Sequence, residues 1–216
     1  MTVRERRRRL LAAAAEVISR DGIASTTTRA ITDEAGMPRG TFHYCFESKN
    51  QLLGELVKSH VRDMVQAAVN DWDDDRPLTE NLTAGLNAFL SVGSSHPQKE
   101  LISYDLTLYA LRSDDPTMAT TQYEDYDRQG AVYLEIVADR AGIDWTAPIS
   151  VLARMFTSMI DGAMLHWLTD RDLAATRASI EAFASALAGL AQPRRRGRRS
   201  GTGRRKETGD GSPAGV

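Results

Sequence analysis

Residues 22–53, GIASTTTRAITDEAGMPRGTFHYCFESKNQLL, decide the fold of this chain. Thr27 or Thr28 can cap a helix over residues 28–35, and Gly36 can take the left-handed conformation that ends one helix and redirects the chain into the next. Pro38 suits the first turn of a second helix that runs to about residue 45. Two short helices joined by so tight a turn predict a helix-turn-helix.

The second helix of this pair has an apolar side and a polar side. Its large apolar residues should anchor it inward, and these are Met37, Phe42 and Phe46. The side chains left to face outward are Arg39, Thr41, His43 and Tyr44. Such a helix fits the major groove of DNA, where Arg39 can reach O6 and N7 of a guanine and Thr41 and His43 lie near base edges.

The run TTTRAITDEAGMPRGTFHYCFESKNQLL resembles the DNA-binding signature of the TetR (tetracycline repressor) family of bacterial transcription regulators, over about residues 6–56. The matching parts are the Thr-Thr-Arg start, the Ala-Gly turn, the core Gly40-Thr41-Phe42, the aromatic Phe46, and Ser48-Lys49 before a long helix. The resemblance implies that Thr28, Tyr44 and Lys49 hold DNA phosphates. It also implies a homodimer on a palindromic operator, most often a repressor that a small-molecule effector releases.

The expected DNA contacts combine the outward face of the helix with the matching positions of the signature. They are Thr27, Thr28, Arg39, Gly40, Thr41, His43, Tyr44 and Lys49. Cys45 departs from the family pattern, which usually has His or a basic residue at this position. A thiol brings no positive charge, so a phosphate contact from this position has no support.

The composition is that of a soluble globular protein, with 42% apolar and 26% charged residues. A single cysteine cannot form an internal disulfide, which indicates a reducing compartment, the cytoplasm. The opening MTVRERRRRLLAAAAEV is basic, but its apolar run stops at Glu16 after six residues, shorter than the core of a usual secretory signal. No later stretch reaches the length that crosses a membrane.

The net charge of −2 conceals an asymmetry along the chain. Residues 1–50 carry 9 Lys/Arg against 6 Asp/Glu, a balance of +3, and residues 193–216 carry 8 against 2, or +6. Residues 51–192 carry 10 against 21, or −11. Basic ends on an acidic middle suggest that the ends meet a polyanion and the middle does not, and the acidic middle raises the hypothesis of a cationic ligand.

The apolar patterns outside the helix-turn-helix predict helices and no strand of any length. The expected helices cover residues 4–20, 48–72, 78–95, 98–112, 151–167 and 173–191, with one more from a cap at 114–116 to about 141. The fold class is therefore all-α, with a three-helix helix-turn-helix domain at 1–50 joined by a long helix to a helical effector-binding and dimerisation domain at 51–192. Residues 193–216 have too few apolar residues to order themselves and are expected to form a disordered basic tail.

The segment 151–167 carries an unbroken apolar stripe, and the last helix follows it with apolar residues on one side and small residues elsewhere. The resemblance implies that these two helices form a four-helix bundle with the same pair of a second subunit. The alternative is that they form the core of a monomer. The expected dimer contacts are Val151, Met155, Met159, Met164, Trp167, Ile180, Phe183 and Leu187.

The helical middle of the chain offers aromatic and polar side chains for an unknown small-molecule effector. The candidate lining residues are Tyr104, Asp105, Tyr109, Tyr126, Met159 and Trp167, each of which can equally be a core residue. His60 or His166 is a possible polar group of such a cavity. The alternative is a dimeric DNA-binding regulator without a small-molecule effector, controlled by a protein partner or by its abundance.

The sequence contains no spacing that is typical of a catalytic, cofactor or metal site. The four histidines are scattered, and the acidic run at 71–75 has no complementary ligands. We therefore expect no enzyme, cofactor or metal. A flexible tail of 23 residues from Arg194 has a typical reach of ~25 Å, so it either adds sequence-independent phosphate contacts or only aids solubility.

Overall fold

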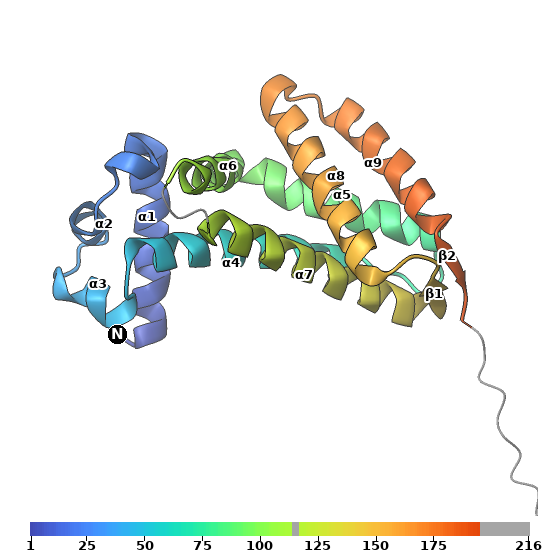
Figure 1. The fold of residues 1–216 in the computed structure, drawn as a ribbon, viewed down its shortest axis with the longest axis horizontal. Coiled ribbons are helices and arrows are strands. Elements are labelled where there is room, and N and C mark those ends of the chain that lie inside the picture. The colour runs from blue at the N-terminus through green and yellow to red at the C-terminus, as the bar shows by residue number, and fades with distance from the viewer. Residues whose placement is uncertain (114–116, 195–216) are drawn as a thin grey trace, which may run out of the picture.

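The computed structural model describes residues 1–113 and 117–194, and within them the chain forms nine α-helices and two short strands (Figure 1). The first three helices form a head at one end, and the long helix α4 runs from this head into a helical bundle. The predicted all-α fold class is confirmed. The predicted cap at 114–116 and the predicted tail from residue 195 onward lie outside the described residues.

The head consists of α1 (Val3–Ser25), α2 (Thr28–Glu34) and α3 (Gly40–Cys45). α1 kinks at Gly22, whose φ of 77° belongs to the left-handed region, close to where the sequence predicts the end of this helix. Thr27 caps α2, because its hydroxyl oxygen accepts a hydrogen bond of 3.1 Å from the Ala30 amide. The local signals of residues 22–35 therefore set the start of the helix-turn-helix.

The turn between α2 and α3 is closed by backbone hydrogen bonds around Gly36, which has φ 62°. The Gly36 amide donates to the Asp33 carbonyl at 3.1 Å, and the Met37 amide donates to the Thr32 carbonyl at 2.9 Å. This pair of bonds is the Schellman motif, which satisfies the last carbonyls of a helix. A side chain with a Cβ is disfavoured at this φ, so glycine is required here.

α3 begins at Gly40, two residues later than predicted, because Pro38 belongs to a tight turn that precedes the helix and accepts a hydrogen bond from the Thr41 amide at 2.9 Å. Its inward anchors are placed as predicted: Phe42 and Phe46 are almost fully buried, and so is Met37. They pack with apolar residues of α1, α2 and α4 in one hydrophobic cluster, the head core.

Two helices belong to both ends of the molecule. α4 (Lys49–Asn70) contributes Leu52, Leu53, Leu56 and Val57 to the head core and Met64, Val65 and Ala68 to the core of the bundle. α6 (Pro97–Leu111) places Ile102 and Leu106 in the head core, where it packs against α1. The domain boundary at residue 50 stays a prediction, since side chains beyond it help to build the head core.

The bundle is formed by the far part of α4 with α5 (Leu78–Ser95), α7 (Thr117–Ala141), α8 (Ile149–Asp170) and α9 (Leu173–Ala188). α5 has the predicted bounds 78–95, and Gly93 is buried inside it. Arg171 ends α8 in a left-handed conformation with φ 60°, and Asp172 caps α9. No helix within the described ranges combines the length and apolarity needed to cross a membrane.

The prediction that the chain contains no strand is wrong for two three-residue segments. β1 (Ile143–Trp145) follows α7, β2 (Ala191–Pro193) follows α9, and the two pair antiparallel. The Arg194 amide extends this pairing with a 2.9 Å bond to the Gly142 carbonyl, and its guanidinium pairs with Asp139 and Asp144. This end of the bundle lies far from α3 (Figure 1).

Replacing Gly85 by alanine should destabilise the fold by about 1–3 kcal/mol. A Cβ at this position of α5 would lie 2.5 Å from the hydroxyl of Tyr133 and 3.1 Å from the carbonyl oxygen of Ala68, and Tyr133 is buried. Gly54→Ala in α4 is the matched control, because a Cβ there meets nothing within 4 Å. That variant should equal the parent or gain up to about 1 kcal/mol. Urea unfolding measures both, and equal stabilities would contradict the packing argument.

Candidate DNA-binding face and effector cavity

The outward face of α3 carries the side chains that the sequence assigns to DNA. Arg39, Gly40, His43 and Tyr44 are exposed and Thr41 is partly exposed, so all five are accessible in the free protein. The guanidinium of Arg39 has no hydrogen-bond or ion-pair partner among the described residues. Its position at the N-terminal end of α3 leaves it free to reach a ligand in front of the helix.

A second group of cations surrounds this face from α1. The guanidinium of Arg6 lies over the Tyr44 ring at 5.6 Å from its centroid, which puts a positive charge beside the C-terminal end of α3. Arg7 is used inside the head: it binds the Cys45 carbonyl and the Glu55 carboxylate and lies over the Phe46 ring. Of these two arginines, Arg6 is therefore the one positioned for a phosphate.

Lys49 is placed differently from the other expected contacts. Its ammonium donates to the carbonyls of Ile23 at 3.1 Å and Thr26 at 3.0 Å and lies 5.5 Å from the centroid of the Tyr109 ring. Partial burial lowers the pKa of this ammonium. In this structure Lys49 holds the kinked end of α1 and touches α6, so its charge serves the inside of the head.

Cys45 is buried in the head core, 5% exposed, as an apolar residue would be. This agrees with the absence of a basic side chain at this position of the signature. Thr27 is exposed and Thr28 partly exposed at the start of α2, beside the same surface. The DNA-contact assignments themselves stay predictions, because the structure holds the protein alone.

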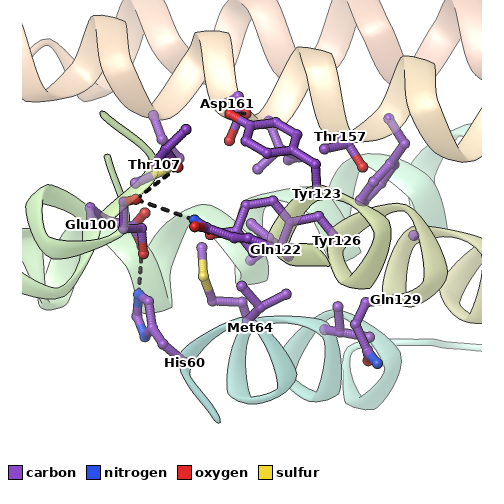
Figure 2. Close-up of a pocket in the computed structure, with 18 of the residues that line it drawn as sticks. His60, Met64, Glu100, Thr107, Gln122, Tyr123, Tyr126, Gln129, Thr157 and Asp161 are labelled. Atoms are coloured by element: carbon purple, nitrogen blue, oxygen red, sulfur yellow. Dashed lines mark hydrogen bonds and ion pairs between the residues drawn. The ribbon is translucent and has the colours of Figure 1, made fainter. Parts of the chain in front are cut away.

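A cavity of about 50 Å³ lies in the bundle between α4, α6, α7 and α8 (Figure 2). By its size it holds a few water molecules. Its walls are mostly aromatic and aliphatic, with Phe89, Phe156, Ile160, Met64 and Met164 among them. The polar groups that face it are His60, Glu100, Ser103, Tyr104, Thr107, Gln122, Tyr123, Tyr126, Gln129, Thr157 and Asp161.

The tyrosines of the cavity are fixed around Asp161 of α8. The Tyr123 hydroxyl donates to Oδ2 of Asp161 at 2.7 Å, and the Tyr104 hydroxyl donates to the backbone carbonyl of the same residue at 2.8 Å. The Gln122 amide donates to the Tyr126 hydroxyl at 2.7 Å. Burial is the main cause that raises the pKa of each of these three tyrosines, so they are neutral donors.

The cavity contains two carboxyl groups in different surroundings. Glu100 Oε1 lies 2.6 Å from Nε2 of His60, and both residues are buried. The side-chain carboxyl of Asp161 has, among the described residues, only the neutral Tyr123 hydroxyl as a hydrogen-bond partner. Burial raises the pKa of Asp161, with further contributions from Glu100 and Asp127. Among the lining residues there is no Lys or Arg.

Two of the six predicted effector residues, Tyr104 and Tyr126, line this cavity. The other four do not. Asp105 points to solvent from the opposite side of α6, and Tyr109 packs against the head core. Met159 lies in a surface groove between α8 and α9, and Trp167 is buried in the bundle core. The orientation of their helices keeps these four side chains out of this cavity, and their contact with an effector stays a prediction.

The candidates from the sequence do not include Tyr123, Gln122, Glu100 and Asp161, and they include His60 only as an alternative to His166. A signal was present for two of them. His60 and Asp161 each stand beside apolar residues at helical spacing, where a polar side chain either meets a partner inside or lines a cavity. The pairs of Glu100 with His60 and of Asp161 with Tyr123 each join two different helices, so spacing along one helix could not find them.

The expected dimer contacts divide into two sets. Met164, Trp167, Ile180 and Leu187 are buried in the bundle core of the single chain, and their part in a dimer contact stays a prediction. Val151 and Met155 are exposed, at 50% and 43%, and Met159 and Phe183 are partly exposed. The outward side of α8 thus remains as the apolar surface of this pair of helices.

Within the described part of the chain no group of three or more His, Cys, Asp or Glu side chains is arranged to hold a metal ion. His60 and Glu100 form an isolated pair, and no serine or cysteine nucleophile faces the cavity beside them except Ser103, whose hydroxyl donates to the Lys99 carbonyl at 3.1 Å. The arrangement can bind and orient a small molecule.

Comparison with known proteins places the chain. The sequence model described as "Bacterial regulatory proteins, tetR family" matches residues 10–56. The HTH-type nicotine-responsive transcriptional repressor HdnoR of Paenarthrobacter nicotinovorans is 27% identical over 171 residues, which are 77% of this chain and 85% of that protein.

Solved structures share the fold over most of the chain. A transcriptional regulator from Rhodococcus sp. Rha1 superposes with a TM-score of 0.65 at 16% identity, covering 86% of this chain and 97% of that one. The transcriptional regulator FadR from Bacillus subtilis, solved with stearoyl-CoA, has a TM-score of 0.63 at 17% identity, with 83% and 96% covered. The helix-turn-helix head of this chain is therefore that of the TetR family of bacterial transcription regulators, and the rest of the chain shares the fold of that family's structures.

Proposed function

We propose that the protein is a homodimeric repressor that reads a palindromic operator with α3 and is released from it by a small-molecule effector bound in the cavity of the bundle. The single observation that carries this proposal is the position of the cavity: it adjoins α4 and α6, the two helices that also build the head core. The nicotine response of one relative and the stearoyl-CoA bound to one structural neighbour support a small-molecule effector.

On the DNA side, Arg39 reads a base, with Thr41 and His43 beside it, while Tyr44 and Thr28 hold phosphates. Arg6 joins the phosphate group, because its guanidinium lies over the Tyr44 ring at the edge of the same face. Lys49 leaves that group, since two backbone carbonyls occupy its ammonium. Thr27 and Gly40 contribute through the backbone, as the cap of α2 and the first residue of α3.

The effector acts through α6. One side of this helix carries Glu100, Ser103, Tyr104 and Thr107 into the cavity, and the other side carries Ile102 and Leu106 into the head core. A molecule that enlarges the cavity must displace α6 or the helices around it. Because packed cores rearrange rather than deform continuously, such a displacement repositions the head and changes the spacing of the two α3 helices in a dimer.

The dimer forms through the outward side of α8 together with α9. Val151, Met155, Gly162 and Leu165 lie along this side and are exposed. Apolar side chains around an exposed glycine suit a helix-to-helix contact, because the glycine lets a partner helix approach closely. Two-fold symmetry then doubles the number of base pairs that one short α3 can read.

One observation favours the alternative of a regulator without a small-molecule effector, and it is the small free volume of about 50 Å³. A compound screen decides between the two. Preferred DNA is first selected from random duplexes, and compounds are then tested for thermal stabilisation of the protein and for release of that DNA. The proposal expects compounds that do both. DNA binding that no compound alters, in a protein that no compound stabilises, would favour the alternative.

A further inference from the structure

The cavity distinguishes between chemical classes of ligand, and this inference rests on the proposed function of the same cavity. We infer that the effector is a small organic cation, a protonated or quaternary amine on a compact apolar body, with Asp161 as its counter-ion and Tyr104, Tyr123 and Tyr126 as its aromatic walls. The argument rests on charge, on the tyrosines and on what the cavity excludes.

The charge of the lining is unbalanced. Glu100 has His60 at 2.6 Å, so this carboxyl has a partner that can carry a compensating charge. The carboxyl of Asp161 has the Tyr123 hydroxyl, which brings no charge. Lys58 of α4 and Arg128 of α7 are paired with Asp125, which does not line the cavity. Asp161 is therefore partly buried, and its carboxyl has no ion-pair partner among the described residues.

Placing such an acid in a cavity is costly unless a positive charge joins it. Burial disfavours the charged form of Asp161 and therefore raises the pKa of this carboxyl. A cationic group bound at the free carboxylate oxygen would offset this cost directly. A neutral ligand would leave it in place, and an anionic ligand would add to it.

The tyrosines complete a site for a cation. The rings of Tyr123 and Tyr126 lie 5.3 Å apart with an angle of 57° between their planes, and the Tyr104 hydroxyl is tied to the Asp161 backbone. Figure 2 shows the Tyr123 side chain next to Asp161, and Tyr126 between Tyr123 and Met64. The face of an aromatic ring attracts ammonium groups, and several rings around one acid form a cage for them.

The rest of the lining sets the body of the ligand. Phe89, Phe156 and Ile160 form apolar walls, and Met64 and Met164 are flexible side chains that can yield as a ligand enters. A long acyl chain with a phosphorylated head would find no Lys or Arg among the lining residues. The anionic class of ligand seen in one structural neighbour is therefore not expected here.

The test uses pairs of compounds that differ only in charge. Choline is compared with 3,3-dimethylbutan-1-ol, and benzyltrimethylammonium with neopentylbenzene; phenylacetate is the anionic member. Calorimetry and thermal shift on the full chain measure binding. We expect each cation to bind about tenfold to a hundredfold more tightly than its neutral partner. Asp161→Asn should abolish this preference. Asp105→Asn is the control, because it removes an exposed acid on α6 that does not line the cavity, and it should keep the preference.

Equal binding of a cation and its neutral partner, binding of phenylacetate, or an unchanged preference in Asp161→Asn would overturn the inference. Failure of every cation to bind at millimolar concentration would also count against it. A screen of neutral and anionic compounds separates this failure from that of the proposed function. Release of DNA by such a compound would leave the effector proposal intact and refute only the charge assignment. A melting temperature of free Asp161→Asn that is no lower than that of the parent shows that the variant is folded.

Discussion

Gly162→Arg is expected to turn the dimer into a monomer and to weaken binding to a symmetric DNA site by about 100- to 10,000-fold. Gly162 lies on the outward side of α8, and a Cβ there meets nothing within 4 Å, so the subunit itself can accommodate an arginine. Removing a glycine from a helix should even stabilise the subunit, by up to about 1 kcal/mol. A loss of DNA binding could then not be attributed to unfolding.

Sedimentation at several concentrations and fluorescence anisotropy on the selected DNA measure the two parts of this prediction. Thr120→Arg, on the exposed side of α7, adds the same charge away from α8 and is the matched control. It should remain a dimer with unchanged or slightly stronger DNA binding. A Gly162→Arg protein that sediments as a dimer would show that the subunits meet through another surface.

Arg39→Ala is expected to weaken binding to the preferred DNA by about 5- to 150-fold for each half-site and to relax the preference at one base pair. The side chain is exposed at the start of α3 without a partner among the described residues, so its removal leaves nothing buried or unpaired in the head. Two copies act in a dimer, and their losses multiply on a palindrome. Selection from random duplexes, repeated with the variant, measures the preference.

The controls for Arg39→Ala separate base reading from charge. Arg140→Ala removes the same charge from the exposed last turn of α7 and should leave both affinity and preference unchanged. Tyr44→Phe removes one hydroxyl from the expected phosphate contacts and should weaken preferred and random DNA alike. If Arg39→Ala also lowered both affinities by one common factor, the assignment of Arg39 to a base would be wrong.

The head was predictable because its signals are local. The cap at Thr27, the left-handed Gly36 and the anchors Phe42 and Phe46 each act within a few residues of their position in the sequence. The two strands were not predictable, because residues 143–145 and 191–193 are three-residue segments that pair although they lie far apart in the sequence. Neither segment is long enough to show an alternating pattern.

Lys49 shows a different limit of the sequence. The resemblance to the TetR signature implies a phosphate contact for this residue. Its actual partners are the carbonyls of Ile23 and Thr26, which the kink at Gly22 brings within reach. Such a contact depends on the three-dimensional path of α1, so it cannot be predicted from the residues next to Lys49 in the sequence.

The cavity and the dimer surface were predicted only in part for one physical reason. The stripe of α8 repeats at i, i+1, i+4 and i+5, so it is wide enough to cover two faces of the helix. Phe156 and Met164 face the bundle, while Val151 and Met155 face outward. Periodicity gives the width of the apolar stripe. Which side of the stripe is buried within the chain depends on how α5, α7 and α9 pack against α8.

The double placement of α6 has a consequence for how the gene can vary. Leu106 packs in the head core, and Thr107, its neighbour in the chain, lines the cavity. Successive positions of α6 are therefore constrained by different contacts. Changes on the head side should yield cells in which repression is lost, and changes on the cavity side cells in which repression no longer responds to its signal. Since one backbone carries both sides, we expect few neutral substitutions along this helix.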